Sequence, residues 1–334
     1  MHWNSEPSSD MQKKVIIDCD VGVDDALALI FAFHSPELDV RAITGVNGNV
    51  PLDQVYENIR RVLTLIRPVH KPWIARGADR PLKGDPVYAY SFHGKDGLGE
   101  ATIARRDGTD WWQTSSLRAD ELITTSARQC PGEITLIAVG PLTNLALGLR
   151  QDPEGMGKLK EVVIMGGAVR TKGNMTPYAE FNIFVDPWAA KAVFESGLPI
   201  TLVPLDVTQQ VSLTPQLIKE RIEPMNHSFS QFLIEATGYD LTVQRFTRGY
   251  EAFHLHDPLA VGSTIDPDLV QKESCFLQVE TREGGNYGQT TEVRGGVSEH
   301  QKIDVCFGVD SVRCLNLFLS RLGSEPDRFA HSSL

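Results

Sequence analysis

The sequence has no apolar segment long enough to cross a bilayer. Its longest apolar run, Ala26 to Phe33, has eight residues, whereas a membrane-spanning helix needs about 20. Residues 1–12 are polar and lack the apolar stretch of a signal peptide, so we expect a flexible tail there and a single domain over residues 13–334. These absences predict a cytoplasmic protein without a membrane partner.

Paired cysteines and basic runs are also missing. The five cysteines show no CxxC spacing, and an odd number argues against a complete disulfide framework. The net charge is −11, and no run of Lys and Arg offers a surface for nucleic acid. A neutral small-molecule partner therefore fits this chain better than a phosphate-rich one.

Aspartate, in contrast, is unusually dense at one turn. Four aspartates follow the apolar run 15–17 within eight residues: Asp18, Asp20, Asp24 and Asp25. Like charges this close need a cation or hydrogen-bond donors, and several hard oxygens favour Ca²⁺ or Mg²⁺. The apolar run predicts a strand and residues 25–33 predict a helix, so the cluster lies on a turn where open α/β sheets bind ligands. Helix capping would account for Asp24 or Asp25 alone.

The order of apolar runs predicts an α/β fold with a mostly parallel central sheet flanked by helices. The strands expected in the first two thirds are 15–17, 40–46, 134–139, 162–165 and 200–205, with a helix over 53–66. The last third predicts a helical segment over 213–246 and a closing helix over 311–322. Between them we expect a small antiparallel addition with strands 276–279, 290–293 and 303–307.

Two further polar segments are candidates for a site. Glu180 and Asn182 alternate in a segment that we expect to be extended, so both would point the same way and suit sugar hydroxyls. Asp186 is interpreted as the cap of a helix over 188–196. His256 precedes Asp257, which is followed by proline; an Asp-Pro pair alone is a common helix start, and the chain has five.

These segments resemble the inosine-uridine preferring nucleoside hydrolase family. The shared motifs are DxDxxxDD at 18–25, GPLTN at 140–144, VIMGG at 163–167, AEFN at 179–182 and HDPxA at 256–260. Val21 departs from the family, which has proline there. The resemblance implies the nucleoside hydrolase α/β fold and hydrolysis of the N-glycosidic bond of ribonucleosides to ribose and a free purine or pyrimidine base.

The resemblance also implies roles for single residues. One Ca²⁺ would be bound by Asp20, Asp25, Asp257 and the backbone carbonyl of Thr143, with Asp20 also activating the attacking water. His256 would act as the general acid for the leaving base. The remaining substrate contacts would be Asp24, Asn49, His93, Met165, Asn174, Glu180, Asn182 and Tyr250. A homo-oligomer, tetramer or dimer, is implied as well.

Three other interpretations stay open. A phosphatase could use the DxD turn with Mg²⁺, although that enzyme class leaves the AEFN and HDP segments without a role. A nucleoside-binding protein that depends on Ca²⁺ but is catalytically silent could use the same scaffold. His254 and His256 could bind a transition metal as a pair, but no cysteine lies beside them.

Overall fold

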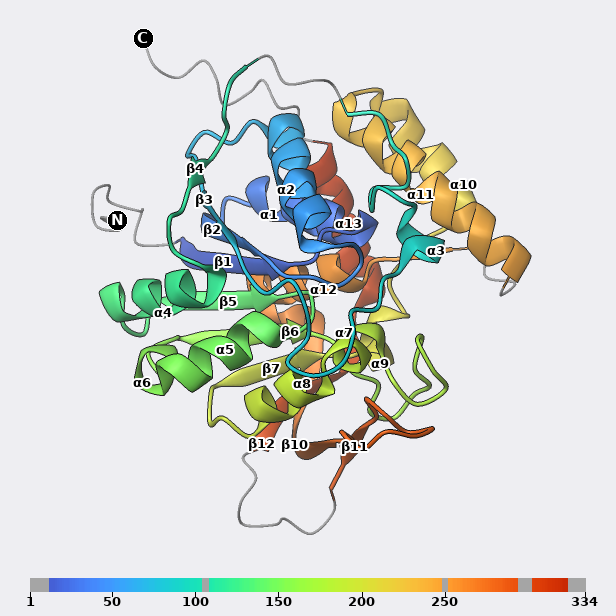
Figure 1. Ribbon diagram of the computed structural model, residues 1–334. Helices are drawn as coiled ribbons and strands as arrows, with labels where there is room; N and C mark the ends of the chain where they lie inside the picture. Colours follow the sequence, from blue (N-terminus) through green and yellow to red (C-terminus); the bar gives the residue numbers. More distant parts are fainter. Residues whose placement is uncertain (1–11, 104–107, 248–251, 294–301, 324–334) are drawn as a thin grey trace.

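The computed structural model describes residues 12–103, 108–247, 252–293 and 302–323. Residues 1–11 of the predicted tail lie outside this range. Ten strands form one sheet in the order β11-β10-β12-β7-β6-β5-β1-β2-β3-β4 (Figure 1). The strands are β1 Lys13–Cys19, β2 Leu38–Gly45, β3 Trp73–Arg76, β4 Gln113–Thr114, β5 Ile134–Ala138, β6 Glu161–Met165, β7 Ile200–Val203, β10 Val270–Val279, β11 Thr290–Glu292 and β12 Lys302–Val309.

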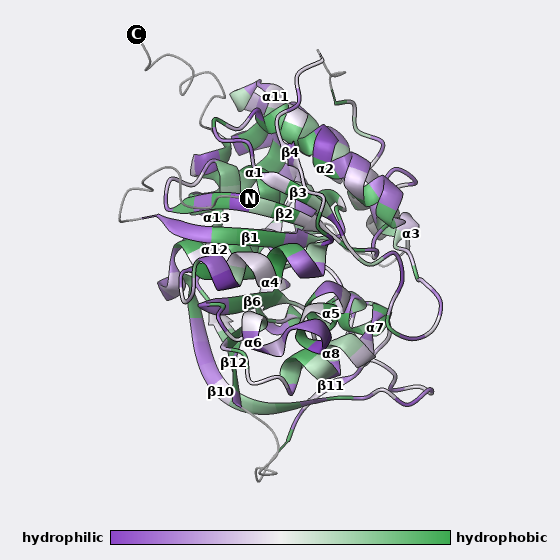
Figure 2. Cartoon of the chain, turned by 60° about the vertical axis from the view of Figure 1, so that its left-hand side comes forward, coloured by the Kyte–Doolittle hydropathy of each residue, from purple (hydrophilic) through white to green (hydrophobic). Residues whose placement is uncertain are grey.

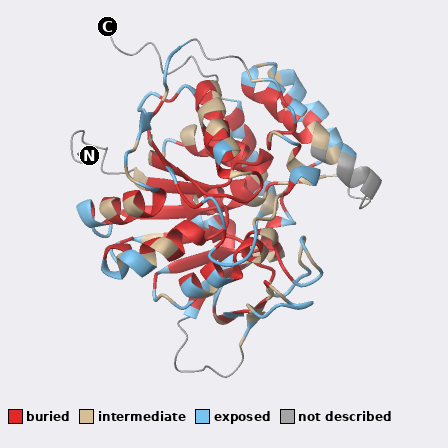
Figure 3. Cartoon of the chain, viewed as in Figure 1, coloured by how far each residue is buried: buried red, intermediate tan, exposed pale blue. Residues whose placement is uncertain are grey.

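Helices cover both faces of the sheet (Figure 1). One layer contains α1 Val23–Phe33, α2 Leu52–Ile66, α12 His256–Ile265 and α13 Ser311–Leu322. The other contains α4 Ala119–Gln129, α5 Thr143–Gln151, α6 Pro153–Met156 and α8 Pro187–Phe194. Successive side chains of β1 point to opposite faces of the sheet and so contribute to the hydrophobic core on each face. Val15 and Ile17 pack against the first layer of helices, and Ile16 packs against the second. Figure 3 shows buried residues running through the strands and the inner sides of both layers.

The sheet reverses its order of strands at β1. This strand pairs in parallel with β2 on one side and with β5 on the other. The connections that leave β1 and β5 therefore run in opposite directions, which opens a crevice at the carboxyl ends of the strands. The acidic turn after β1 lies at this position, as the sequence predicts for a ligand site.

The α/β class, the mostly parallel sheet and the small antiparallel addition are confirmed. β12 pairs in parallel with β7, whereas β10 is antiparallel to β12 and to β11. The strand predicted at 303–307 thus belongs to the antiparallel addition and joins it to the parallel part. Figure 2 shows the start of β10 as hydrophilic, which agrees with the exposure of residues 271–274; the short strand β11 pairs with residues 277–279 at the other end of β10.

The helical segment predicted over 213–246 is interrupted. It contains the short helix α10 Pro215–Leu217, a π-helical turn Ile218–Ile222 and a 3₁₀ turn Glu223–Met225 before α11 Ser228–Thr247 begins. Asn226 adopts the left-handed conformation, with φ of 46°, and ends the first part as Asn often does. A small sheet pairs β8 Ser212–Leu213 with β9 Phe253–His254. None of the helices in the described ranges combines the length and apolar character that a membrane span requires.

Candidate active site

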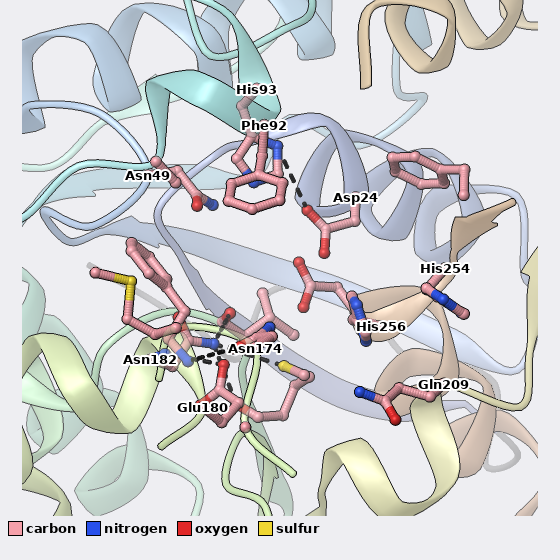
Figure 4. Close-up of a pocket in the computed structure, with 18 residues that line it drawn as sticks. Asp24, Asn49, Phe92, His93, Asn174, Glu180, Asn182, Gln209, His254 and His256 are labelled. Carbon is pink, nitrogen blue, oxygen red and sulfur yellow. Dashed lines mark hydrogen bonds and ion pairs between the residues drawn. The ribbon is translucent and has the colours of Figure 1, made fainter. Parts of the chain in front are cut away.

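A cavity lies at the carboxyl ends of the strands (Figure 4). The predicted site residues that line it are Asp24, Asn49, His93, Met165, Asn174, Glu180, Asn182, His256 and Asp257. Asp20 and Asp25 are fully buried and do not line it, but both hydrogen bond to Asn49, which does. Tyr250 lies outside the described residues. The fold therefore gathers nearly all of the predicted site in one place.

The acidic turn is held by its own carboxylates. Asp25 is the third residue of α1, and it accepts the N–H groups of Gly22 at 2.8 Å and Asp20 at 3.1 Å. Asn49 joins the loop after β2 to this turn, because its N–H donates to Asp20 at 2.6 Å and its amide donates to Asp25 at 3.1 Å. Asp25 thus has a capping role in addition to any role as a ligand.

Two glycines leave the room that the Asp20 carboxylate occupies. A Cβ on Gly48 would lie 2.0 Å from Asp20 Oδ2, and a Cβ on Gly140 would lie 3.0 Å from Oδ1. The segments after β2 and β5 therefore enclose this carboxylate from two sides. Asp18 points elsewhere: it is bound by Thr44 and Asn144, and burial raises its pKa to about 7.

The carboxylates at the base of the cavity fit a cation. Asp24, Asp25 and Asp257 offer oxygens that all lie within 4.8 Å of one another. Asp20 Oδ1 and Asp257 Oδ2 are buried and have no hydrogen-bond partner among the described residues. Burial raises the pKa of Asp20 and Asp257 well above the usual range, and burial with the neighbouring charge of Asp24 raises that of Asp25 to about 6. A metal ion would relieve this repulsion, and an all-oxygen set suits Ca²⁺ or Mg²⁺.

Thr143 does not reach the cavity. It is the first residue of α5, and its hydroxyl donates to Asp186 at 2.7 Å. The carbonyl of a first helical residue points along the helix axis toward the carboxyl end, here away from the cavity. Val139, which follows β5, lines the cavity instead, and its carbonyl accepts the amide of Asn182 at 2.8 Å. The structure thus places Val139, and not the predicted Thr143, on the wall of the cavity.

Glu180 and Asn182 lie at the start of a helix, so the prediction of an extended segment is wrong. Glu180 is the N-cap of α7 Phe181–Val185 and accepts the N–H groups of Asn182 at 2.9 Å and Ile183 at 3.1 Å. A further contact, from the N–H of Gly167 at 3.0 Å, ties α7 to the end of β6. Burial raises the pKa of Glu180. Both side chains still reach the cavity because the cap and the second helical residue face it.

Met165 and Asn174 lie beside this pair. The sulfur of Met165, at the end of β6, is 3.6 Å from the amide nitrogen of Asn182. Asn174 accepts the N–H of Phe181 at 2.9 Å and so fixes the loop before α7. The cap predicted at Asp186 is confirmed, since its carboxylate accepts the N–H of Ala189 at 3.0 Å at the start of α8.

Histidines line the opposite side of the cavity. His93, in the short helix α3 Tyr90–His93, accepts the N–H of Val23 at Nδ1 over 3.1 Å, and this nitrogen lies 4.0 Å from Asp24 Oδ1. Nδ1 of His256 lies 2.7 Å from the hydroxyl of Thr208. Burial, with smaller effects of His254 and His93, lowers the pKa of His256 to about 3. Asp257 is the second residue of α12 and therefore not the N-cap that an Asp-Pro pair alone would suggest.

Several residues of the cavity had no signal in the sequence. Phe92, Met175, Gln209 and Phe253 line it without belonging to a recognisable motif. In Figure 4 His254, His256 and Gln209 lie together on one side, while Glu180, Asn174 and Asn182 lie together on another. The rings of His254 and His256 are 5.5 Å apart, but in the described part of the chain they join no group of three metal-binding side chains. The transition-metal interpretation thus gains no support.

Comparison with known proteins decides the family. The family model described as inosine-uridine preferring nucleoside hydrolase matches residues 15–316. The chain belongs to this nucleoside hydrolase family. As a nucleoside hydrolase it is an enzyme, an N-ribohydrolase. The family that the sequence motifs indicated is confirmed.

Relatives of this nucleoside hydrolase differ in the bases that their names mention. It is 36% identical over 314 residues to the pyrimidine-specific ribonucleoside hydrolase RihA of Shewanella sp. (strain MR-7), covering 93% of this chain and 96% of that protein. A plant nucleoside hydrolase, PpNRh1, has a TM-score of 0.85 at 32% identity, covering 94% and 99%. A purine-preferring ribonucleoside hydrolase from Gardnerella vaginalis also has a TM-score of 0.85 at 32% identity, covering 93% and 98%.

Proposed function

We propose that this nucleoside hydrolase cleaves the N-glycosidic bond of ribonucleosides with the help of one Ca²⁺, giving ribose and a free base. The observation that supports this proposal most is the group of buried carboxylates at the base of a cavity whose walls carry amides and imidazoles. Such a cavity suits an uncharged sugar and base. No Lys or Arg is among the described residues that line it, which disfavours the phosphatase alternative.

Asp20, Asp25 and Asp257 are the proposed ligands of the ion. Oxygen atoms of Asp20 and Asp257 are buried without a hydrogen-bond partner in the described ranges, so they are available to a cation. When bound, Ca²⁺ lowers the pKa of a coordinated water and positions it for attack. The backbone oxygen proposed to complete the set is that of Val139, which follows β5 and lines the cavity, in place of Thr143, which lies inside α5.

The side chains around the cavity would have different roles in hydrolysis. Asp20 would orient the water and accept its proton as the water oxygen bonds to C1′ of the sugar. Nearby carboxylates stabilise the positive charge that develops on the sugar while the bond to the base breaks. The proposed sugar contacts are Asp24, Asn49, Met165, Asn174, Glu180 and Asn182. The proposed base contacts are His93, Tyr250 and His256, with His256 assisting the departure of the base.

A substrate panel tests the proposal. Uridine and cytidine come first, because the curated relatives are named pyrimidine-specific at 34–37% identity, and inosine follows. We expect free ribose from at least one of them at micromolar enzyme with added Ca²⁺, and no phosphate from p-nitrophenyl phosphate. Binding of a nucleoside without ribose release would favour the catalytically silent alternative, and phosphate release would favour the phosphatase. We also propose that the protein is cytoplasmic and forms a homo-oligomer, a tetramer or a dimer. Sedimentation of the purified chain would test the oligomeric state.

A further inference from the structure

The hydroxyl of Thr208 meets the ring of His256 across two elements that the backbone holds together. Thr208 ends the short helix α9 Leu205–Thr208, is fully buried, and places Oγ1 at 2.7 Å from Nδ1 of His256. Just beyond this contact, Leu255 donates its N–H to Val211 at 2.9 Å, and β8 pairs with β9. These backbone hydrogen bonds hold the segment of Thr208 beside the segment of His256, so the contact between the two side chains does not depend on the side chains alone.

The direction of this hydrogen bond follows from the surroundings of the hydroxyl. If Nδ1 carried the proton and donated to Thr208, the hydroxyl hydrogen would need another acceptor. Among the described residues His256 is the one hydrogen-bond partner of this hydroxyl, and Thr208 is fully buried. A buried donor without an acceptor costs about 1–3 kcal/mol. Donation from Thr208 to Nδ1 satisfies the hydroxyl, and in the neutral ring it leaves the proton on Nε2.

We propose that Thr208 is a positioning residue for His256, and that its hydroxyl selects the ring tautomer that presents an Nε2–H donor to the departing base. This inference rests on the proposed function. As the bond from C1′ to the base nitrogen breaks, its electron pair moves onto the base, which accepts a hydrogen bond from Nε2–H. The attacking water leaves its oxygen and one hydrogen on C1′, and its other hydrogen leaves as a proton that the free base finally takes up.

Two substitutions of Thr208 separate this role from packing. Thr208→Val removes the hydroxyl and keeps the branched shape, whereas Thr208→Ser keeps the hydroxyl. For the best nucleoside we expect kcat/KM to fall about 10-fold in Thr208→Val, the effect of one hydrogen bond, and to stay within about 3-fold in Thr208→Ser. p-Nitrophenyl riboside has a leaving group that needs no such donor, so its kcat/KM should fall by less than about 3-fold in both.

A matched control comes from the other layer of helices. Thr124 in α4 is also a buried threonine, but its hydroxyl donates to carbonyls of its own helix, Asp120 at 3.0 Å and Glu121 at 3.1 Å. Thr124→Val should leave the ratio of the two kcat/KM values unchanged. If Thr208→Val does not fold, Thr208→Ala serves in its place, with thermal unfolding as the check.

The tautomer itself has a direct readout. In enzyme with ¹⁵N-labelled histidine, NMR should show Nε2 of His256 protonated in the parent and in Thr208→Ser, and a mixed population in Thr208→Val; the signal is assigned by its loss in His256→Ala. A parent with Nδ1 protonated would overturn the proposal. Equal losses on both substrates, or no loss on either, would also overturn it. A parent that releases no ribose from any nucleoside would contradict the proposed function instead, and the NMR result would still decide the tautomer.

Discussion

Asn144 donates a hydrogen bond of 2.8 Å to Asp18, the first aspartate of the acidic turn. The same amide donates to the carbonyl of Gly45 at 3.2 Å, and its oxygen accepts the N–H of Ala78 at 2.8 Å. One side chain at the start of α5 thus joins β1, the end of β2 and the segment after β3. These are the carboxyl ends of strands that carry the site, so Asn144 is expected to hold them in register.

Removing this amide should destabilise the fold. Asn144→Ala leaves the buried N–H of Ala78 and the carboxylate of Asp18 short of a partner, each at a cost of about 1–3 kcal/mol. Urea unfolding in a chelator should therefore give a lower free energy of unfolding by at least about 1 kcal/mol. The exposed Asn316 in α13 offers a control, since Asn316→Ala should change stability by less than about 0.5 kcal/mol. Equal stabilities of the two variants would refute the role of Asn144.

Asp257→Asn should change stability in opposite directions with and without Ca²⁺. The substitution removes one buried charge from a repelling group, so in a chelator the variant should be at least as stable as the parent. With Ca²⁺ at 100 times its Kd, the parent should gain about 2.7 kcal/mol and the variant little. Calorimetry should show the matching loss of Ca²⁺ affinity, and an exposed control, Asp268→Asn, should bind like the parent. Unchanged affinity in Asp257→Asn would remove Asp257 from the ligands.

Much of this site could be predicted because its signals are local. Within 20 residues the sequence has an apolar strand, then a dense set of aspartates, then apolar residues at helical spacing. These local patterns are enough to predict the turn after β1 and its ligand site. The position of Thr143 could not be predicted in this way, because it depends on where α5 begins relative to the end of β5. The direction of β12 depends on its pairing with β7, about 100 residues earlier in the chain. The contact of Thr208 with His256 joins residues 48 apart and has no sequence motif.

His256→Ala should separate departure of the base from activation of water. The variant should lose kcat with inosine or uridine by up to about 10²–10⁴, because their leaving bases need a donor. Its loss on p-nitrophenyl riboside should be far smaller. Asp20→Ala should lose activity on both substrates to the same extent, since both reactions need an activated water. The exposed His70 gives a control variant, His70→Ala, with both rates unchanged. Losses of the same size on both substrates in His256→Ala would exclude a role in base departure.

The sugar hydroxyls should be recognised strictly. The walls of the cavity place Asp24, Asn49 and Asn182 around the position proposed for ribose, and a site built to hydrogen bond a hydroxyl rejects an analogue that lacks it. We expect kcat/KM for 2′-deoxyuridine to be at least about 10²-fold below that for uridine. Comparable turnover of uridine and 2′-deoxyuridine would contradict the placement of the ribose beside these residues.

Ribose release from a ribonucleoside, followed through removal and return of the metal, tests the central proposal most directly. The purified chain is assayed with its best nucleoside as prepared, after treatment with a calcium chelator, and after Ca²⁺ is added back in excess. The buried carboxylates predict that release stops in the chelator and returns with Ca²⁺, in the parent but not in Asp257→Asn. Ribose release that continues undiminished after complete removal of the metal would contradict the proposal.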